Sequence, residues 1–219
     1  MVLLAVANAN YELVYVNFGT NGRVSDGGVI DQTDFYTKLK HGNLQLPQVN
    51  SSNGLPYVFV GDEAFALRPD FLKPYNIRAL DDMKRIFNYR LSRARRIVEN
   101  VFGILVSRFG VLRSEIRLKP ENIDCVVLAC CALHNCLRNK APTSYSPNDV
   151  LDQEEPITHV FQEGLRAIGP NIADIVPCHG RNSTDEAKSI RDKYTVYFNT
   201  VGKVSWQNRL ALVNDSRDS

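Results

Sequence analysis

The sequence predicts an α/β protein, because short runs with strand spacing near its start are followed by longer runs with helix spacing. Residues 2–7 and 11–18 are two β-rich runs around an Asn-Ala-Asn break, which is the pattern of a hairpin. Residues 81–109 and 122–138 carry apolar side chains at a largely helical period. With 219 residues, 44% of them hydrophobic and 23% charged, the chain can bury one sizeable core and a small appendage.

Between the hairpin and the long helix, the pattern predicts a loop, a helix and a third strand. The loop is the glycine-rich stretch 19–28, and apolar residues at roughly helical spacing follow it between 29 and 39. Residues 57–60 are β formers that stop abruptly at a glycine. The third strand is therefore expected to end directly before Asp62.

The long apolar stretches predict two further helices. Residues 81–109 should be mostly one long helix, although Gly103 weakens the period. Residues 122–138 are a second, strongly apolar helix candidate, and the Pro- and Asp-rich residues 141–156 are typical of a linker. We therefore expect a first domain over residues 1–140, followed by that linker.

Beyond the linker, residues 157–219 are expected to form a small helical C-terminal extension. Two amphipathic helices are predicted, over 157–168 and 184–199. Ser183 with Glu186 three residues later resembles a capping box that opens the second of them. This extension carries no residue pattern that points to chemistry.

Composition restricts the partners and the compartment. A net charge of +2 and a pI near 8.3 say little on average, so a nucleic-acid signal must come from local clustering. Four of the five cysteines crowd one apolar stretch where a helix cannot easily cross-link them, which is typical of a reduced, intracellular protein. The N-terminal run has no basic region and turns polar at Asn8, so neither a signal peptide nor a membrane span is expected.

Two acidic residues stand where chemistry is expected in an α/β fold. Asp62 follows the third strand, and the carboxyl ends of strands are where ligand crevices form. Glu99 lies 37 positions later in the long helix, among apolar neighbours where an unpaired acid would be costly to bury. A divalent metal held by carboxylates is one partner for it. The alternative is a helical ion pair with Arg95 or Arg96, at i−4 and i−3.

A basic stretch surrounds Glu99. Between residues 84 and 119 the chain has ten basic residues against two acidic ones, Glu99 and Glu115. Such a local excess on a nearly neutral chain predicts a surface that binds phosphate groups. The alternative is a solvated helix face. The ten basic residues are Lys84, Arg85, Arg90, Arg93, Arg95, Arg96, Arg108, Arg113, Arg117 and Lys119.

Three segments follow in the order and spacing of the PIF/Harbinger transposase nucleases. They are GDEAFAL, FNYRLSRARRIVENVFGILVSRFGVLR and CCALHNCLRNK. These segments resemble the family's D-x-x-[FY] strand end, its N-x-x-x-S-x-x-R-x-x-x-E-x-x-F-G helix and its L-H-N helix. The N-terminal hairpin and a Gly-x-x-x-Asp element before the first helix are also similar. The resemblance runs from about residue 2 to residue 140.

The resemblance implies an RNase H-like mixed sheet with packed helices, in which three carboxylates bind two divalent metal ions, Mg²⁺ or Mn²⁺, and cut DNA. Asp62 and Glu99 resemble the second and third catalytic and metal-binding acids. Asp26 resembles a further acid of the family and is a candidate metal ligand, although in Ser-Asp-Gly-Gly it is equally a turn former. DNA, a separate DNA-binding partner protein and a nuclear location are also implied. The candidate DNA-binding residues are Lys84, Arg85, Arg90, Arg93, Arg95 and Arg96.

The first carboxylate of that set is not found. The family's strand that bears it, with an Asp, a small residue and then Thr-His, should precede residue 2 and be central in the sheet. Asn8 and Asn10 are neutral and cannot offset the charge of a dication. Two explanations stay open: the sequence is truncated at its N-terminus, or it is a transposase relic. The first hypothesis is therefore a metal-dependent DNA endonuclease domain, and the alternative is an inactive module that binds DNA or protein.

The segment CVVLACCALHNC does not predict a zinc site. Structural zinc sites use Cys pairs separated by a loop, whereas these thiols lie in an apolar helix, where Cys behaves as a small hydrophobe. We expect Cys130 and Cys131 in the core. His134 and Asn135 are expected to form hydrogen bonds at the helix end rather than to catalyse.

Overall fold

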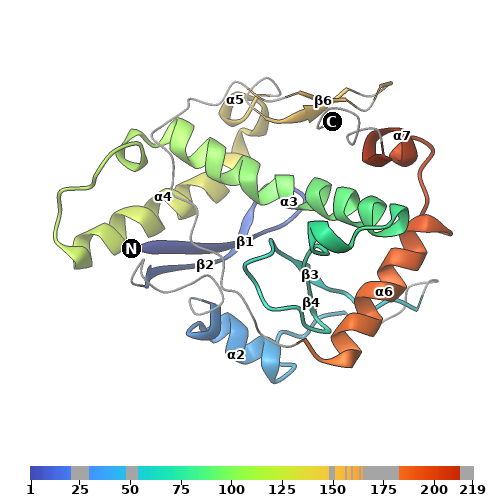
Figure 1. Cartoon of the computed structure of the whole chain (residues 1–219). Helices are drawn as coiled ribbons and strands as arrows, with labels where there is room; N and C mark the ends of the chain where they lie inside the picture. The colour runs from blue at the N-terminus through green and yellow to red at the C-terminus, as the bar shows by residue number, and fades with distance from the viewer. Residues whose placement is uncertain are drawn as a thin grey trace. The chain divides into compact units, whose positions relative to one another are not determined.

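The protein has a mixed α/β architecture in its computed structural model (Figure 1). The described residues form three two-stranded sheets and several helices. Among them, no helix combines the length and the apolarity that a membrane span requires. The structure describes residues 1–20, 30–47, 54–147, 151–155, 157–158, 160–162, 164 and 183–212.

The chain divides into two compact units, and each is made of two separate stretches of sequence. The first unit consists of Met1–Val24 and Arg96–Ile175, and the second of Ser25–Arg95 and Val176–Ser219. The boundary between Arg95 and Arg96 falls inside one long helix. The domain boundaries expected at residues 140 and 156 stay predictions.

The first unit contains the predicted hairpin, which is confirmed. Strands β1 (Val2–Ala7) and β2 (Leu13–Thr20) pair antiparallel, with irregularities in the register near both ends. The Asn8 side chain closes the turn, because its Oδ1 accepts from the backbone N–H groups of Asn10 at 2.9 Å and Glu12 at 3.1 Å. The asparagine that looked like a break between two strands is thus the residue that builds the turn.

Two helices cover one face of this hairpin. They are the C-terminal half of α3 (Asp82–Arg108) and α4 (Pro120–Lys140), and both predicted helices are confirmed. Helix α3 runs through Gly103 without interruption. Pro120 suits the first turn of α4, where its missing N–H would have no partner in any case. The core between hairpin and helices includes Leu3, Ala5, Leu13, Val16, Val101, Leu105, Val127 and Cys131.

The predicted linker contains secondary structure that packs on the first unit. It holds α5 (Pro142–Tyr145) and β5 (Gln153–Glu154), and β5 pairs antiparallel with β6 (Phe161–Gln162). Tyr145 and Leu151 are buried against α3. In its described part, the helix predicted over 157–168 is wrong, because the backbone there pairs with β5 instead of with itself.

The second unit contains the predicted third strand, which is shorter than expected. Strand β3 (Phe59–Val60) pairs in parallel with β4 (Phe71–Leu72). Helix α2 (Asp34–Lys40) precedes them, and a 3₁₀ turn, η1 (Ile77–Ala79), follows. The Thr33 side chain caps α2. The prediction of a helix after the glycine-rich loop is therefore confirmed for residues 34–40.

Helix α6 (Asp185–Asn199) packs on the N-terminal half of α3 in the second unit, and the predicted helix is confirmed. Its cap is Thr184 rather than Ser183, since the Thr184 hydroxyl accepts from the Ala187 N–H at 3.2 Å. The core of the second unit includes Leu67, Leu72, Tyr75, Phe87, Leu91, Ala187, Tyr194 and Phe198.

In the first unit, a 3₁₀ turn, η2 (Gly110–Leu112), lies in the connection between α3 and α4.

Helix α7 (Gln207–Leu212) is an element that the sequence pattern did not predict. It is held by Gln207, whose side chain is fully buried. The Gln207 Nε2 donates to the carbonyl oxygen of Phe198 at 2.8 Å, and its Oε1 accepts from Arg90 at 3.2 Å. A single buried amide thus joins α7 to α6 and α3.

Candidate active site

Asp62 lies in the second unit, directly after β3, where the chain makes a tight turn. Gly61 permits this turn, because a Cβ there would lie 2.6 Å from the Phe71 ring and 2.7 Å from the Phe65 ring. The Asp62 side chain is partly buried, and its Oδ1 accepts from the Ala64 N–H at 2.8 Å. The turn therefore holds the carboxylate through its own backbone.

Lys73 is a cation beside the same turn. Its Nζ donates to the carbonyl oxygen of Glu63 at 3.0 Å. Burial is the main cause that lowers the pKa of Lys73, and Arg191 lowers it further, whereas the charges of Glu63 and Asp62 raise it. The end of β3 thus combines a carboxylate with a nearby positive charge.

Asp31 is a second acid of this unit that lies near the turn. It lines a small cavity of about 10 Å³ together with Phe65 and Ala66 from the turn after β3. Arg68 also lines it and forms a two-pronged ion pair with Asp70, at 2.8 Å and 3.0 Å. A cavity of this size has room for about one water molecule. The cavity is therefore a packing gap rather than a substrate pocket.

Glu99 lies in the first unit on α3 and is exposed. The expected cost of burying it does not arise, because the buried residues of this half of α3, such as Val101 and Leu105, lie on the other side of the helix. The buried polar residue is its neighbour Asn100, which is 2% exposed. The Asn100 Oδ1 accepts from the Asp152 N–H at 3.0 Å. Sequence reasoning missed Asn100, since its partner lies in the stretch that was expected to be a linker.

Arg96, one turn before Glu99, has an acidic partner in the first unit. Its guanidinium lies 3.8 Å from a carboxylate oxygen of Glu154 on β5, and the two side chains are 21% and 14% exposed. Contact with an acid makes Arg96 less available to a phosphate. Its predicted role in DNA binding therefore requires competition with Glu154.

Arg90, another predicted DNA-binding residue, makes its contacts inside the second unit. Its guanidinium donates to the carbonyl oxygen of Gly202 and to the side chain of Gln207, both at 3.2 Å. It also lies over the Phe198 ring, 4.8 Å from the centroid. Burial is the largest cause that lowers the pKa of Arg90, and the charge of Arg93 acts in the same direction. Arg90 therefore supports the packing of α6 and α7.

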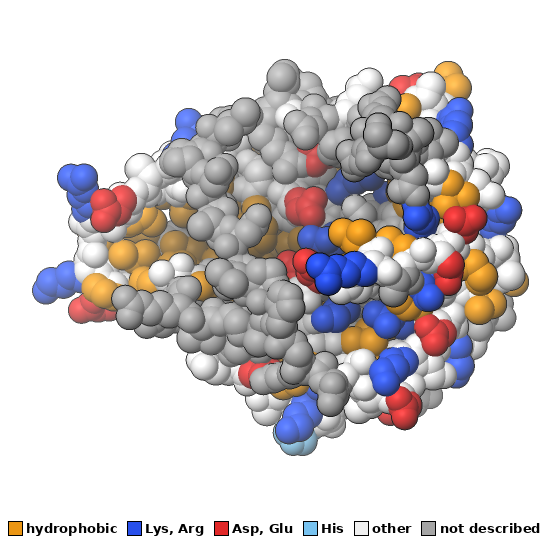
Figure 2. Space-filling view, in the orientation of Figure 1, with side chains coloured by type: hydrophobic (Ala, Val, Ile, Leu, Met, Phe, Trp, Pro, Cys, Tyr) orange, Lys and Arg blue, Asp and Glu red, His pale blue; other side chains and the backbone are white. Residues whose placement is uncertain are grey.

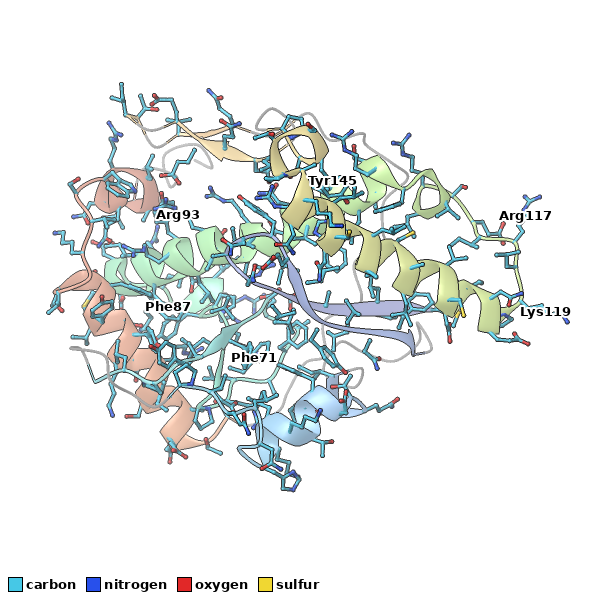
Figure 3. All side chains as sticks on the ribbon, turned by 180° about the vertical axis from the view of Figure 1, so that it is seen from behind. Phe71, Phe87, Arg93, Arg117, Lys119 and Tyr145 are labelled. Atoms are coloured by element: carbon cyan, nitrogen blue, oxygen red, sulfur yellow. The ribbon has the colours of Figure 1, made fainter. Side chains whose placement is uncertain are left out.

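The other predicted DNA-binding residues of this unit differ in their surroundings. Lys84, which is partly buried, forms an ion pair with Asp81 at 2.9 Å, and Arg93, labelled in Figure 3, lies 5.7 Å from the Trp206 ring centroid. Arg85 and Arg95 are partly buried. In the region of α6 and α7, Figure 2 shows Lys and Arg side chains interspersed with Asp and Glu. The DNA-binding role of these residues stays a prediction.

The three predicted metal ligands fall in different parts of the chain. Asp26 lies outside the described residues. Asp62 belongs to the second unit and Glu99 to the first, so their proximity stays a prediction. Within the part of the chain that the structure describes, no three His, Cys, Asp or Glu side chains form a group suited to a metal ion.

Two cysteines of the Cys-rich segment of α4, Cys130 and Cys131, lie in the core, as expected, whereas Cys125 and Cys136 are exposed. Cys130 and Cys131 are 6% and 3% exposed, and burial is the main cause that raises the pKa of Cys131 to about 11. His134 is fully buried and hydrogen-bonded to the carbonyl oxygen of Tyr11 at 2.7 Å and to the hydroxyl of Tyr145 at 3.0 Å. The expectation of a hydrogen-bonding histidine is confirmed, but its bonds connect α4 to the hairpin turn and to α5.

Asn135, the neighbour of His134, also connects α4 to the hairpin. Its side-chain amide binds the backbone of Leu13 twice: Oδ1 accepts from the N–H at 2.9 Å, and Nδ2 donates to the carbonyl oxygen at 2.8 Å. The amide thus pairs with β2 as a neighbouring strand would. His134 and Asn135 together attach α4 to the start of β2, which gives a structural reason for the Leu-His-Asn pattern.

The chain belongs to the DDE superfamily endonucleases, whose family profile matches residues 1–135. The match includes the hairpin, Asp62 and Glu99, and it ends inside α4 at Asn135. The resemblance to PIF/Harbinger transposase nucleases is thereby confirmed at the level of the family.

Curated relatives agree with this assignment. The chain is 26% identical over 142 residues to "Protein ALP1-like" of Arabidopsis thaliana, which covers 63% of this chain and 35% of the relative. It is 27% and 33% identical over 135 residues to "Putative nuclease HARBI1" of Homo sapiens and of Bos taurus, which covers 60% of this chain and 36% of each relative. The chain thus spans about a third of the length of these relatives. No solved structure gives a significant match.

Proposed function

We propose that this chain is the part of a divalent-metal-dependent DNA endonuclease of the Harbinger type that carries two of its catalytic acids, Asp62 and Glu99. The observation that carries the proposal is the family match over residues 1–135, which includes both acids. One acid follows a strand, and the other is exposed on the long helix α3. DNA is the proposed substrate, and the nucleus is the proposed location.

The donor chemistry of Asp62 fits a hard divalent cation such as Mg²⁺ or Mn²⁺. The Ala64 N–H holds Oδ1, and no described residue forms a hydrogen bond to Oδ2. The side chain therefore has one fixed oxygen and one oxygen available to a ligand. When bound, two divalent ions would activate a water or a 3′-hydroxyl and stabilise the leaving oxygen of the phosphodiester.

Other residues of the chain contribute by placing these groups. Gly61 allows the close turn that orients Asp62, and the positive charge of Lys73 favours phosphate oxygens next to it. The buried side chains of Val101 and Leu105 hold α3 against the hairpin, so that Glu99 stands on a rigid helix. A general feature of such sites is that rigid elements carry the reacting groups.

An RNase H-like sheet is our proposal for the complete protein. Among the described residues, β1 pairs with β2 alone, which leaves the other edge of β1 for a further strand. We propose that this strand lies upstream and carries the first Asp of the set. We also propose Asp26 as an additional acid near the metal ions.

Proximity of Asp62 and Glu99 is the geometric requirement of this function. Two metal ions about 3.5–4 Å apart can be reached by both acids only if the carboxylates lie within about 10 Å of each other. A crystal structure of a longer protein that includes the upstream strand, grown with Mn²⁺, would measure this distance. Metal ions bound away from both acids would contradict the assignment.

Cleavage of DNA tests the proposed function directly. A chain extended upstream to include the missing Asp should cut DNA only with Mg²⁺ or Mn²⁺ present, whereas residues 1–219 alone should bind the metal weakly and cut no DNA. In the extended chain, Glu99→Gln or Asp62→Asn should abolish cutting and retain DNA binding, since each keeps the shape and removes the charge. Glu63→Gln is the matched control, because it removes an exposed negative charge from the same turn and keeps the backbone bond to Lys73.

Two outcomes would overturn the proposal. If the extended chain is inert while residues 1–219 bind DNA or a protein tightly, the inactive binding module is the correct function. If residues 1–219 cut DNA in a metal-dependent way, the set of acids is different, and Asp26 or Asp31 replaces the upstream carboxylate.

A further inference from the structure

The side of α4 that faces away from the core of the first unit carries an apolar stripe. Its two leucines, Leu128 and Leu133, are 42% and 52% exposed. The stripe lies opposite the buried face of the helix that contains Val127 and His134, since residues three, four and seven apart share one face. It consists of Cys125, Leu128, Ala129, Ala132, Leu133 and Cys136, all of them exposed.

The stripe has the same residue types in both directions from the middle of α4. The two alanines, the two leucines and the two cysteines are each equidistant from the point between residues 130 and 131. Asn122 and Asn139 continue the pattern outward. At the ends, Glu121 and Lys140 occupy equivalent positions with opposite charges, and both are exposed.

This pattern is complementary to itself under one particular symmetry. If a second α4 lies antiparallel across the first, each leucine meets a leucine, each alanine meets an alanine, and Glu121 of each copy meets Lys140 of the other. A two-fold interface uses the same patch on both copies, so a patch that matches its own reverse satisfies it. A parallel arrangement would place Glu121 against Glu121 and Lys140 against Lys140, which like-charge repulsion disfavours.

The size of the stripe determines how strongly two copies of the chain should associate. Its residues span about 16 Å along the helix axis at about 1.5 Å per residue. The small alanines at the centre allow the two helices to approach to about 8–10 Å. One helix pair of this length buries less than the roughly 800 Å² per partner of a standard interface. The association is therefore expected to be reversible and to depend on concentration.

We propose that the outer face of α4 binds a second copy of this chain, with the two α4 helices antiparallel about a two-fold axis between residues 130 and 131. Figure 3 shows α4 along its length, from the end near Lys119 to the end near Tyr145. The occupant is the same face of a second molecule. This inference does not depend on cleavage, metal binding or the identity of the catalytic acids.

Chemical cross-linking tests the geometry of the pair. In the antiparallel dimer, Cys125 of one copy lies opposite Cys136 of the other, so a short bis-maleimide should join them. Within one chain these thiols are about 16 Å apart along the axis, too far for such a reagent. With a mixture of light and ¹⁵N-labelled protein, mass spectrometry should find Cys125–Cys136 links between copies, and either Cys125→Ser or Cys136→Ser should remove them. Links of Cys125 to Cys125 would overturn the antiparallel arrangement.

Sedimentation equilibrium of the 219-residue chain tests the energetics. Leu128→Asp should weaken the dimer by more than about a hundredfold, because two carboxylates would be buried per dimer against apolar side chains. Leu118→Asp is the matched control: Leu118 is 51% exposed and lies before α4, outside the stripe. Circular dichroism should confirm that both variants fold.

A charge exchange gives a test that preserves the fold. Glu121→Lys and Lys140→Glu should each weaken association about two- to tenfold, because each opposes like charges in an exposed pair. The double variant should restore it. A chain that stays monomeric at every concentration, or a double variant no tighter than the single ones, would overturn the proposal.

Discussion

His134 on α4 and Tyr11 in the hairpin turn are joined by a hydrogen bond of 2.7 Å between the His134 Nε2 and the Tyr11 carbonyl oxygen. A carbonyl oxygen can only accept, so Nε2 carries the proton, and in the neutral ring Nδ1 accepts from the Tyr145 hydroxyl at 3.0 Å. Burial is the largest cause that lowers the pKa of His134 below 6.5, and the charge of Arg138 adds to it, whereas the hydrogen bond to the Tyr11 carbonyl oxygen raises it. The first unit is therefore built around a neutral histidine.

The neutral His134 makes the stability of the first unit depend on pH. Its pKa in the folded state lies below the unfolded value of 6.5, so the folded chain binds fewer protons. The contribution to the free energy of unfolding is complete above pH 6.5 and is lost as the pH falls toward the folded pKa. Urea midpoints measured between about pH 8 and about pH 5 should fall toward acid.

A pair of histidine variants assigns this pH dependence. His134→Gln should be less stable at all pH values and should lose the part of the pH dependence that His134 supplies. His41→Gln should keep all of it, since His41 is exposed on the second unit. An unchanged pH dependence in His134→Gln would show that another group is responsible.

Asn135→Asp tests the attachment of α4 to β2. In the unchanged protein, the Asn135 Nδ2 lies 2.8 Å from the Leu13 carbonyl oxygen. The variant replaces this donor with a carboxylate oxygen, which faces the same carbonyl oxygen. We expect a loss of about 1–3 kcal/mol in the free energy of unfolding, measured by urea denaturation. Asn139→Asp, one turn further along the same helix and exposed, should change it little. Equal losses in both variants would exclude a specific role for Asn135.

Tyr75→Phe tests the docking of α6 in the second unit. The Tyr75 hydroxyl donates to the Asp192 carboxylate at 2.6 Å and lies 2.9 Å from the Thr195 hydroxyl. Its removal should lower the free energy of unfolding by about 1–3 kcal/mol. Tyr57→Phe is the control, because Tyr57 is 51% exposed.

The raised pKa of Tyr75 predicts that the protein loses stability in alkaline solution. Burial is the main cause that raises the pKa of Tyr75 from 10 to about 12, followed by the bond to Asp192. A raised folded-state pKa gives a contribution that is complete below pH 10 and is lost as the pH rises through about 12. Tyr75→Phe should therefore reduce the difference in stability between neutral and alkaline solution, as measured by thermal unfolding. A variant with the full difference would contradict this assignment.

DNA binding by the basic stretch should weaken steeply as salt is added. Arg117, which is 88% exposed, and Lys119 project from the segment that joins α3 to α4 (Figure 3). Arg117→Ala should reduce the slope of log affinity against log salt concentration by about one in a fluorescence polarisation titration. Arg90→Ala should instead lower the free energy of unfolding, because Arg90 holds Gln207 and the Gly202 carbonyl oxygen. DNA binding that does not change with salt, or no DNA binding at low salt, would contradict the proposed binding of nucleic acid by the basic stretch.

Much of the secondary structure could be predicted because it depends on local patterns. The hairpin and helices α3 and α4 follow from apolar side chains at periods of 2 and 3.6, which any chain with that pattern must place on one face. Asp62 and Glu99 could be singled out by their type and their spacing, since the motif is a property of the sequence. The burial and the contacts of these two residues could not be predicted from the sequence.

Tertiary structure decided the features whose partners lie far along the chain. Asn100 is a buried residue because the backbone of Asp152, 52 positions away, donates to it. Residues Phe161–Gln162 form a strand rather than a helix because they pair with β5. Arg90 packs inside the second unit because Gln207 accepts from it across 117 positions. The sequence by itself determined which segments form most helices and the hairpin, whereas long-range hydrogen bonds and burial decided which polar residues become part of the folded interior.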